Sequence, residues 1–146
     1  MSLANLLKIN KLQVHSPTRD AVLRLLEAAN RNLADAHIAE ISAENRFDAA
    51  YKCIMQCSML ALWFNGYRTS TSQPGHHQTA IQTLPTTIGL EQATVIVLDA
   101  LRKQRNVSDY EGDPVSDQAV IECIKQAEEL YRNINAWINK NRADLV

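Results

Sequence analysis

Residues 101–112 hold the densest group of polar side chains in the sequence and read Leu-Arg-Lys-Gln-Arg-Asn-Val-Ser-Asp-Tyr-Glu-Gly. An arginine guanidinium can hold a phosphate through two parallel hydrogen bonds, and a nearby asparagine or tyrosine can orient the ligand. One interpretation of the segment is therefore a phosphate-binding site. The residues predicted to bind the phosphate are Arg102, Arg105, Asn106 and Tyr110.

A purely structural interpretation of the same segment stays open. Arg102, Lys103 and Arg105 would then end a helix, where positive charge suits the helix dipole. The carboxylates of the loop that follows would pair with these cations, and no ligand would be needed.

Two adjacent histidines, His76 and His77, stand at the start of a predicted short helix. Successive side chains on a helix diverge by about 100°, so at most one of the two faces a given cleft. In one interpretation a histidine points toward Arg105, which makes His76 a ligand-binding candidate and His77 a catalytic candidate. In the other, both residues only cap and pack a surface turn.

Three cysteines, Cys53, Cys57 and Cys123, form no disulfide framework, and their odd number favours a reducing, cytoplasmic setting. Cys53 and Cys57 lie four residues apart on one helical face, but a metal site needs more ligands than two thiolates. We expect all three in the core, and we predict no metal and no cofactor. Trp63 and Trp137 are expected in the core or at a dimer interface.

Glycine and proline indicate which elements position these residues. The chain has 146 residues with four of each, and seven of these eight lie between positions 66 and 114. Segments 18–65 and 115–146 contain none, whereas a β-sandwich or barrel needs turn residues about every 8–12 positions. The sequence also lacks the glycine-rich loop of a Rossmann or P-loop enzyme. It therefore predicts an all-α fold.

Apolar residues recur at spacings of three and four throughout residues 18–65, which indicates helix. Ser16 is predicted to be the N-cap of the first helix and Pro17 its first residue. One continuous helix over this stretch would be about 72 Å long, too long for a domain of this size. We therefore place a hairpin near Ile41–Asn45, with Ser42 as the N-cap of the second helix.

Gly66 is predicted to end the second helix. Residues 67–75 are expected to form a polar loop. A short helix is predicted over His76–Leu84, ended or bent at Pro85, because proline disrupts a helix interior. The next helix is predicted over residues 90–107.

A turn is expected at Asp109–Pro114, and Ser116 is predicted to cap the last helix. Long apolar stripes of this period pack as bundles with small crossing angles. The prediction is an antiparallel, up-and-down four-helix bundle with a short extra helix. Residues 1–15 form an N-terminal segment, and residues 16–146 form a single domain.

The formal net charge of −1 gives no general basic field to attract nucleic acid, so any basic site is local. No apolar run approaches the length of about 18 residues that a membrane helix needs. Residues 1–11 lack the long apolar region of a signal peptide. We expect a cytoplasmic protein that does not enter a membrane.

The order of several short motifs resembles the HEPN family. The central motif is Arg-Asn-x-x-Asp-Tyr at residues 105–110, late in the penultimate long helix. Arg-Phe-Asp-Ala-Ala-Tyr at residues 46–51, Gly-Tyr-Arg at 66–68 and Gly-His-His at 75–77 also fit. The resemblance covers about residues 16–140.

This resemblance implies a HEPN-like helical bundle that forms a homodimer. Many family members are metal-independent ribonucleases with an Arg-x(4–6)-His motif, whose two copies meet in a cleft across the dimer. Arg105 matches the motif arginine and Asn106 the polar residue that commonly follows, but the motif histidine has no counterpart, since Tyr110 is followed by Glu and Gly. Tyrosine has an ordinary pKa near 10, which makes it a poor general base at neutral pH.

The resemblance therefore implies nucleotide or RNA binding without nuclease activity. It also implies a prokaryotic toxin–antitoxin or similar two-component module, with a nucleotidyltransferase-type protein as partner. The first alternative is an active endoribonuclease, for which Arg105, Tyr110 and His77 are the catalytic candidates. The second is a structural bundle that serves protein–protein interaction.

Overall fold

The computed structural model describes residues 2–146, and Met1 lies outside this range. The described chain is mostly helical, which confirms the all-α prediction. Its helices are α1 (Leu3–Lys8), α2 (Arg19–Ala36), α3 (Ala43–Phe64), α4 (His76–Gln82), α5 (Leu84–Ile88), α6 (Gln92–Glu111), α7 (Asp117–Asn141) and the 3-10 helix η1 (Ala143–Leu145). Two short strands are present, β1 (Leu12–Val14) and β2 (Tyr67–Thr69).

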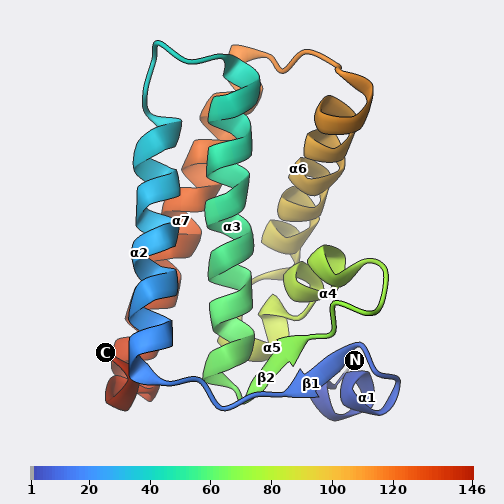
Figure 1. The fold of residues 1–146 in the computed structure, drawn as a ribbon, viewed down its shortest axis with the longest axis vertical. Coiled ribbons are helices and arrows are strands. Elements are labelled where there is room, and N and C mark those ends of the chain that lie inside the picture. Colours follow the sequence, from blue (N-terminus) through green and yellow to red (C-terminus); the bar gives the residue numbers. More distant parts are fainter. Residues whose placement is uncertain (1) are drawn as a thin grey trace.

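The four long helices, α2, α3, α6 and α7, run along the long axis of the molecule, each opposite in direction to the one before it (Figure 1). The central helix is α3: α2 and α7 pack along it, and α4, α5, α6 and β2 also contact it. The buried residues of α6 are Val95, Leu98 and Leu101, all in its first half. Polar contacts therefore hold the second half of α6.

The predicted hairpin between the first two long helices is confirmed. Helix α2 ends at Ala36, and the Ser42 side chain accepts a hydrogen bond of 3.1 Å from the Asn45 amide at the start of α3. Gly66 follows α3 with a φ of +88°, the left-handed conformation that commonly ends helices. Ser116 caps α7 as predicted, by accepting from the Ala119 amide at 3.1 Å.

The predicted start of the first long helix is wrong by two residues. The N-cap of α2 is Thr18, whose hydroxyl accepts a 3.1 Å hydrogen bond from the Ala21 amide. Residues 15–17 instead continue the extended chain after β1, and the His15 amide donates to the Gly66 carbonyl at 2.9 Å. Both Ser16 and Thr18 suit an N-cap, so the sequence did not distinguish them.

Part of the predicted 67–75 loop is a strand. Residues 67–69 form β2, which pairs antiparallel with β1, so that Leu12 lies opposite Thr69. Three-residue strands are too short to show the alternation that identifies a strand. Leu6 and Leu12 are buried, so the N-terminal segment packs onto the rest of the fold.

The two boundaries around the polar segment also differ from the prediction. Helix α4 ends at Gln82, and Pro85 lies in the first turn of α5, where a missing amide is tolerated. Helix α6 runs to Glu111 rather than residue 107, and Gly112 ends it with a φ of +74°. The predicted turn at Asp109–Pro114 therefore starts at Gly112, and Asp109 is helical.

Candidate functional site

The three cations of the polar segment lie in the second half of α6, and each pairs with a carboxylate. Arg102 Nε lies 2.8 Å from Asp99 Oδ1, and Lys103 Nζ lies 3.5 Å from Asp99 Oδ2. Burial raises the pKa of Asp99, but the hydrogen bonds and charges of Arg102 and Lys103 outweigh it and lower that pKa below its ordinary value. Asp99 is therefore an ionised partner for both cations at neutral pH.

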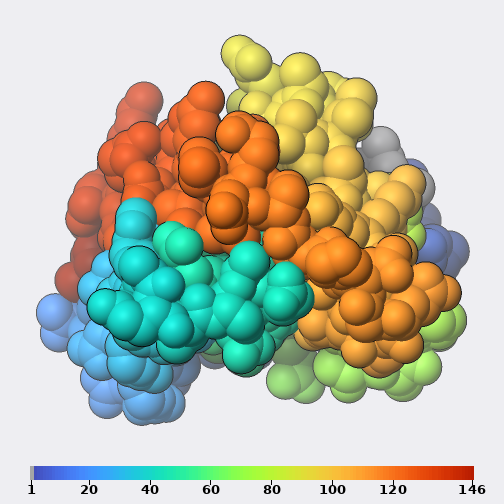
Figure 2. All heavy atoms as spheres, turned by 90° about the horizontal axis from the view of Figure 1, so that it is seen from above, coloured from blue at the N-terminus to red at the C-terminus, as the bar shows by residue number. Residues whose placement is uncertain are grey.

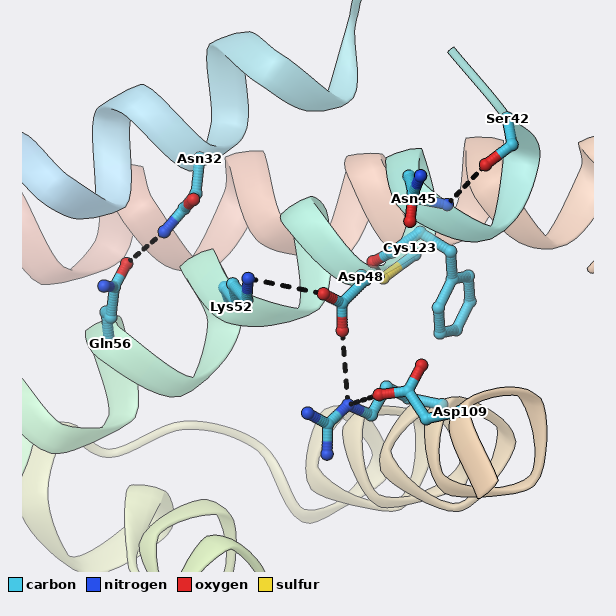
Figure 3. Close-up of polar contacts among 10 residues, drawn as sticks. Asn32, Ser42, Asn45, Asp48, Lys52, Gln56, Asp109 and Cys123 are labelled. Atoms are coloured by element: carbon cyan, nitrogen blue, oxygen red, sulfur yellow. Dashed lines mark hydrogen bonds and ion pairs between the residues drawn. The ribbon is translucent and has the colours of Figure 1, made fainter. Parts of the chain in front are cut away.

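Arg105 connects α6 to α3. Its Nε atom lies 2.9 Å from Asp109 Oδ2, on α6, and 3.3 Å from Asp48 Oδ1, on α3 (Figure 3). Asp48 also pairs with Lys52 at 3.4 Å. The predicted pairing of cations with carboxylates is thus present, although Asp48 was not among the predicted partners. Asp109 pairs with Arg105 from one turn later in the same helix, α6.

The Arg105 guanidinium also lies on the Tyr51 ring, with Cζ 5.3 Å from the ring centroid. Its Nη1 atom donates to Asn106 Oδ1 at 3.3 Å. The hydrogen bonds and ion pairs of Arg105 within residues 2–146 thus engage Nε and Nη1. The Arg105 side chain is 20% exposed, so it is not sealed within the fold.

His77, on α4, joins Arg105 through Tyr51. The Tyr51 hydroxyl lies 3.3 Å from His77 Nδ1, and the His76 ring stands edge-on to His77 with centroids 4.6 Å apart. The ring of Tyr51 therefore contacts the Arg105 guanidinium, and the Tyr51 hydroxyl contacts His77. We name Tyr51, His76, His77, Arg102, Arg105 and Asn106 the Arg105 cluster.

Burial sets the protonation of this cluster. It raises the pKa of Tyr51 to about 12, although the charges of Arg105 and Arg102 partly oppose the rise. Burial also lowers the pKa of His77, and the charges of His76, Arg105 and Arg102 lower it further. At neutral pH Tyr51 therefore keeps its proton, and His77 is a neutral imidazole able to accept one.

Tyr110 does not join the cluster. Its side chain is 80% exposed on the solvent side of α6. Two residues that sequence reasoning did not assign to the site are Tyr51 and Asp48. They lie three positions apart on α3, a spacing that places two side chains on the same helical face. That spacing was the available signal, but nothing local indicated that α6 would pack against it.

The cysteines and tryptophans lie outside the cluster. Cys53, Cys57 and Cys123 are free and buried, as predicted. Phe64 stacks on Trp137 at 5.9 Å, and Trp137 lines an open pocket of about 630 Å³ between the start of α6 and the end of α7. Within residues 2–146 no group of three or more metal-binding side chains is found, and no helix is long and apolar enough to span a membrane.

Comparison of the chain with protein-family models and with curated proteins finds no match. The HEPN resemblance therefore stays a prediction that depends on the short motifs themselves. The Arg105 cluster is established by the geometry above, independently of any family.

The lowered pKa of His77 predicts a pH dependence of stability. As the pH falls below about 6.5, the unfolded chain binds a proton before folded His77 does, so the free energy of unfolding decreases. We expect His77→Gln to remove less than about 1 kcal/mol of this decrease, because the ring is only half-buried and solvent screens its charge. Urea denaturation at about pH 7.5 and about pH 5.5 measures the difference.

Burial and the charge of Arg68 also lower the pKa of His15, so a smaller pH dependence remains in the His77→Gln variant. An identical decrease in the wild type and in this variant would show that His77 titrates normally in the folded protein. That result would contradict the burial of His77 beside Arg102 and Arg105.

Proposed function

We propose that this chain is a HEPN-like four-helix-bundle protein whose Arg105 cluster binds a phosphate group of a nucleotide or RNA. The observation that supports this most is that the Arg105 guanidinium lies over the Tyr51 ring, while the hydroxyl of the same tyrosine lies 3.3 Å from His77 Nδ1. Arginine on an aromatic surface is oriented without losing its outer hydrogen-bond donors. Nη2 makes none of the pairings described above and is available to a phosphate oxygen.

Asp48 and Asp109 set the affinity of this site. Both carboxylates hold Arg105 by Nε, so an incoming phosphate competes with two negative charges. A terminal phosphate carries more charge than either carboxylate, and a phosphate group can accept two hydrogen bonds from one guanidinium. We therefore propose that the carboxylates keep Arg105 in place and limit the affinity for anions.

A second candidate function is metal-independent RNA cleavage. The observation that favours it is the placement of His77, which supplies from α4 an imidazole near Arg105 although the local motif lacks one. A neutral imidazole can take the proton of a ribose 2′-hydroxyl. Tyr110, by contrast, is 80% exposed and lies outside the Arg105 cluster.

The third candidate function is a structural bundle that serves protein–protein interaction. The observation that favours it is the pairing of Arg105 with two carboxylates, those of Asp48 and Asp109.

The proposed context follows the resemblance. It is a homodimer in a cytoplasmic toxin–antitoxin or similar two-component module, with a nucleotidyltransferase-type protein as partner. All residues of the Arg105 cluster come from one chain, so in this proposal each protomer binds its own phosphate.

Two substitutions with opposite effects test the binding function. Arg105→Ala removes the charged donor, so affinity for a labelled single-stranded RNA or for ATP should fall by about 10-fold or more, as loss of a charged hydrogen bond implies. Asp109→Asn removes a competing charge and should raise the affinity several-fold. Fluorescence anisotropy with the RNA, and calorimetry with ATP, measure both changes.

Arg31→Ala is the matched control, because Arg31 is an exposed arginine on α2. Helix α2 lies on the other side of α3 from α4 and α6, which carry most of the Arg105 cluster (Figure 1). Arg31→Ala removes the same charge and should leave binding unchanged. If neither RNA nor ATP binds the wild type, or if Asp109→Asn weakens binding, the proposal of a phosphate-binding site is wrong and the structural function stands.

Incubation with RNA and EDTA tests cleavage. Products with 2′,3′-cyclic phosphate ends that disappear with His77→Ala and persist with Tyr110→Phe would establish the nuclease.

A further inference from the structure

A large pocket lies away from the Arg105 cluster, at the opposite end of α6. Its volume is about 630 Å³, within the range of about 300–1,000 Å³ that small-molecule sites occupy. One wall is the turn from α5 into α6, and the other is the last part of α7. Figure 2 shows these segments side by side, yellow for the start of α6 and orange-red for α7. We name it the α6–α7 pocket.

The wall from α7 presents polar and aromatic side chains at helical spacing. Asn133, Trp137 and Lys140 lie four and then three positions apart, so they share one face of the helix. Phe64 stacks on the Trp137 ring, with 5.9 Å between the centroids and 9° between the planes. This contact holds the indole in place, so the pocket has one wall with a flat apolar surface.

The opposite wall carries a negative charge. Ile88 and Leu90 add apolar surface, and Glu91 is the N-cap residue of α6, whose side chain makes no capping hydrogen bond. Glu91 and Lys140 are the two charged residues among those that line the pocket. No ion pair within residues 2–146 engages either side chain. Two opposite charges therefore border one pocket without neutralising each other.

We propose that the α6–α7 pocket binds a free aromatic amino acid. In this arrangement the ammonium group of the ligand pairs with Glu91, its carboxylate pairs with Lys140, and its ring packs on Trp137. Packed aromatic rings gain more free energy than the burial of their area alone provides. The Asn133 amide, on the same face of α7, offers a hydrogen-bond donor and an acceptor to the polar end of the ligand.

The two charges select against ligands that carry only one. A nucleotide or another anion would bring its charge toward Glu91, and a simple amine would bring its charge toward Lys140. Unfavourable charge contacts of this kind are one way in which a site rejects the wrong ligand. An amino acid carries both charges on one carbon and satisfies both residues. The indole then favours an aromatic side chain over an aliphatic one.

This inference does not depend on phosphate binding, because no residue of the Arg105 cluster lines the α6–α7 pocket. Failure of either proposal therefore leaves the other in place. The pocket is open to solvent, and L-phenylalanine has about 12 non-hydrogen atoms, so we expect weak binding with a dissociation constant of about 1 mM.

Calorimetry with related ligands tests the complementarity of charge. N-acetyl-L-phenylalanine lacks the ammonium group and L-phenylalaninamide lacks the carboxylate. Each should bind about 3–5-fold more weakly than L-phenylalanine, as expected for loss of an exposed ion pair. L-leucine should also bind more weakly, because it has no ring to pack on the indole. Equal binding of these ligands, or no binding of L-phenylalanine at about 10 mM, would overturn the inference.

Two variants assign the charges to their partners. Glu91→Gln should lose the preference for L-phenylalanine over its N-acetyl form, and Lys140→Gln should lose the preference over the amide. The controls are Glu111→Gln, at an exposed glutamate at the other end of α6, and Lys125→Gln, at an exposed lysine earlier in α7. Both should keep the preferences of the wild type. A Glu91→Gln or Lys140→Gln variant that keeps them would show that the proposed arrangement is wrong.

Tryptophan fluorescence locates the bound ligand. The chain has two tryptophans, so Trp63→Phe leaves Trp137 as the single emitter. Addition of L-phenylalanine should change the Trp137 emission in parallel with the calorimetric titration. Unchanged emission while calorimetry records binding would place the ligand elsewhere and overturn the site.

Discussion

Replacement of Tyr51 by alanine is expected to lower the free energy of unfolding by about 3–5 kcal/mol, the usual cost of deleting a buried aromatic side chain. Tyr51 is fully buried at the centre of α3, so its removal leaves a cavity beneath Arg105. The guanidinium loses its support, and His77 loses its hydroxyl partner. The variant should therefore also lose binding of RNA and ATP. Urea denaturation and fluorescence anisotropy measure the two effects.

Two further variants separate packing from hydrogen bonding. Tyr51→Phe keeps the ring and removes the hydroxyl, so it should cost about 1 kcal/mol and leave the support for Arg105 in place. Tyr110→Ala deletes an exposed tyrosine and should leave monomer stability within about 0.5 kcal/mol of the wild type. If Tyr51→Ala cost no more than Tyr51→Phe, Tyr51 would not occupy the core position described above.

Replacement of Ile134 by alanine is expected to destabilise the protein by about 2–5 kcal/mol. Ile134 lies on α7 and is 0% exposed. Deletion of its side chain removes apolar contacts and leaves a cavity that the surrounding helices fill only in part. Chemical denaturation followed by circular dichroism measures the change.

Ile121→Ala provides an internal comparison, because it is the same substitution on the same helix at an exposed position. Its cost should stay within about 0.5 kcal/mol. Equal costs at positions 121 and 134 would mean that α7 presents a different face to the core.

The helical periodicity of the sequence was enough to predict the long helices, because each must bury one continuous stripe. Ser42 was the informative residue at the first hairpin, since its hydroxyl caps α3 where no glycine or proline breaks the pattern. The two strands could not be predicted in this way. Each has three residues, and their pairing depends on a contact between segments more than 50 positions apart.

The candidate site was predicted only in part. Arg102, Arg105 and Asn106 stood out because charged and amide side chains cluster in the sequence. Tyr51 and Asp48 did not, because they join the site through the packing of α6 against α3, a tertiary contact with no local pattern. The end of α6 was placed too early, so Asp109 was assigned to a loop. In the structure its position one turn after Arg105 makes it a partner within the helix.

The central position of α3 has a consequence for synthesis on the ribosome. Its first neighbour, α2, precedes it in the chain, so these two helices can pair as soon as residue 64 has emerged. A second flank of α3 waits for α7, which is made more than 50 residues later. At about 5–20 residues per second, that flank stays uncovered for several seconds. During this interval the nascent chain presents an apolar helical surface of the kind that chaperones bind.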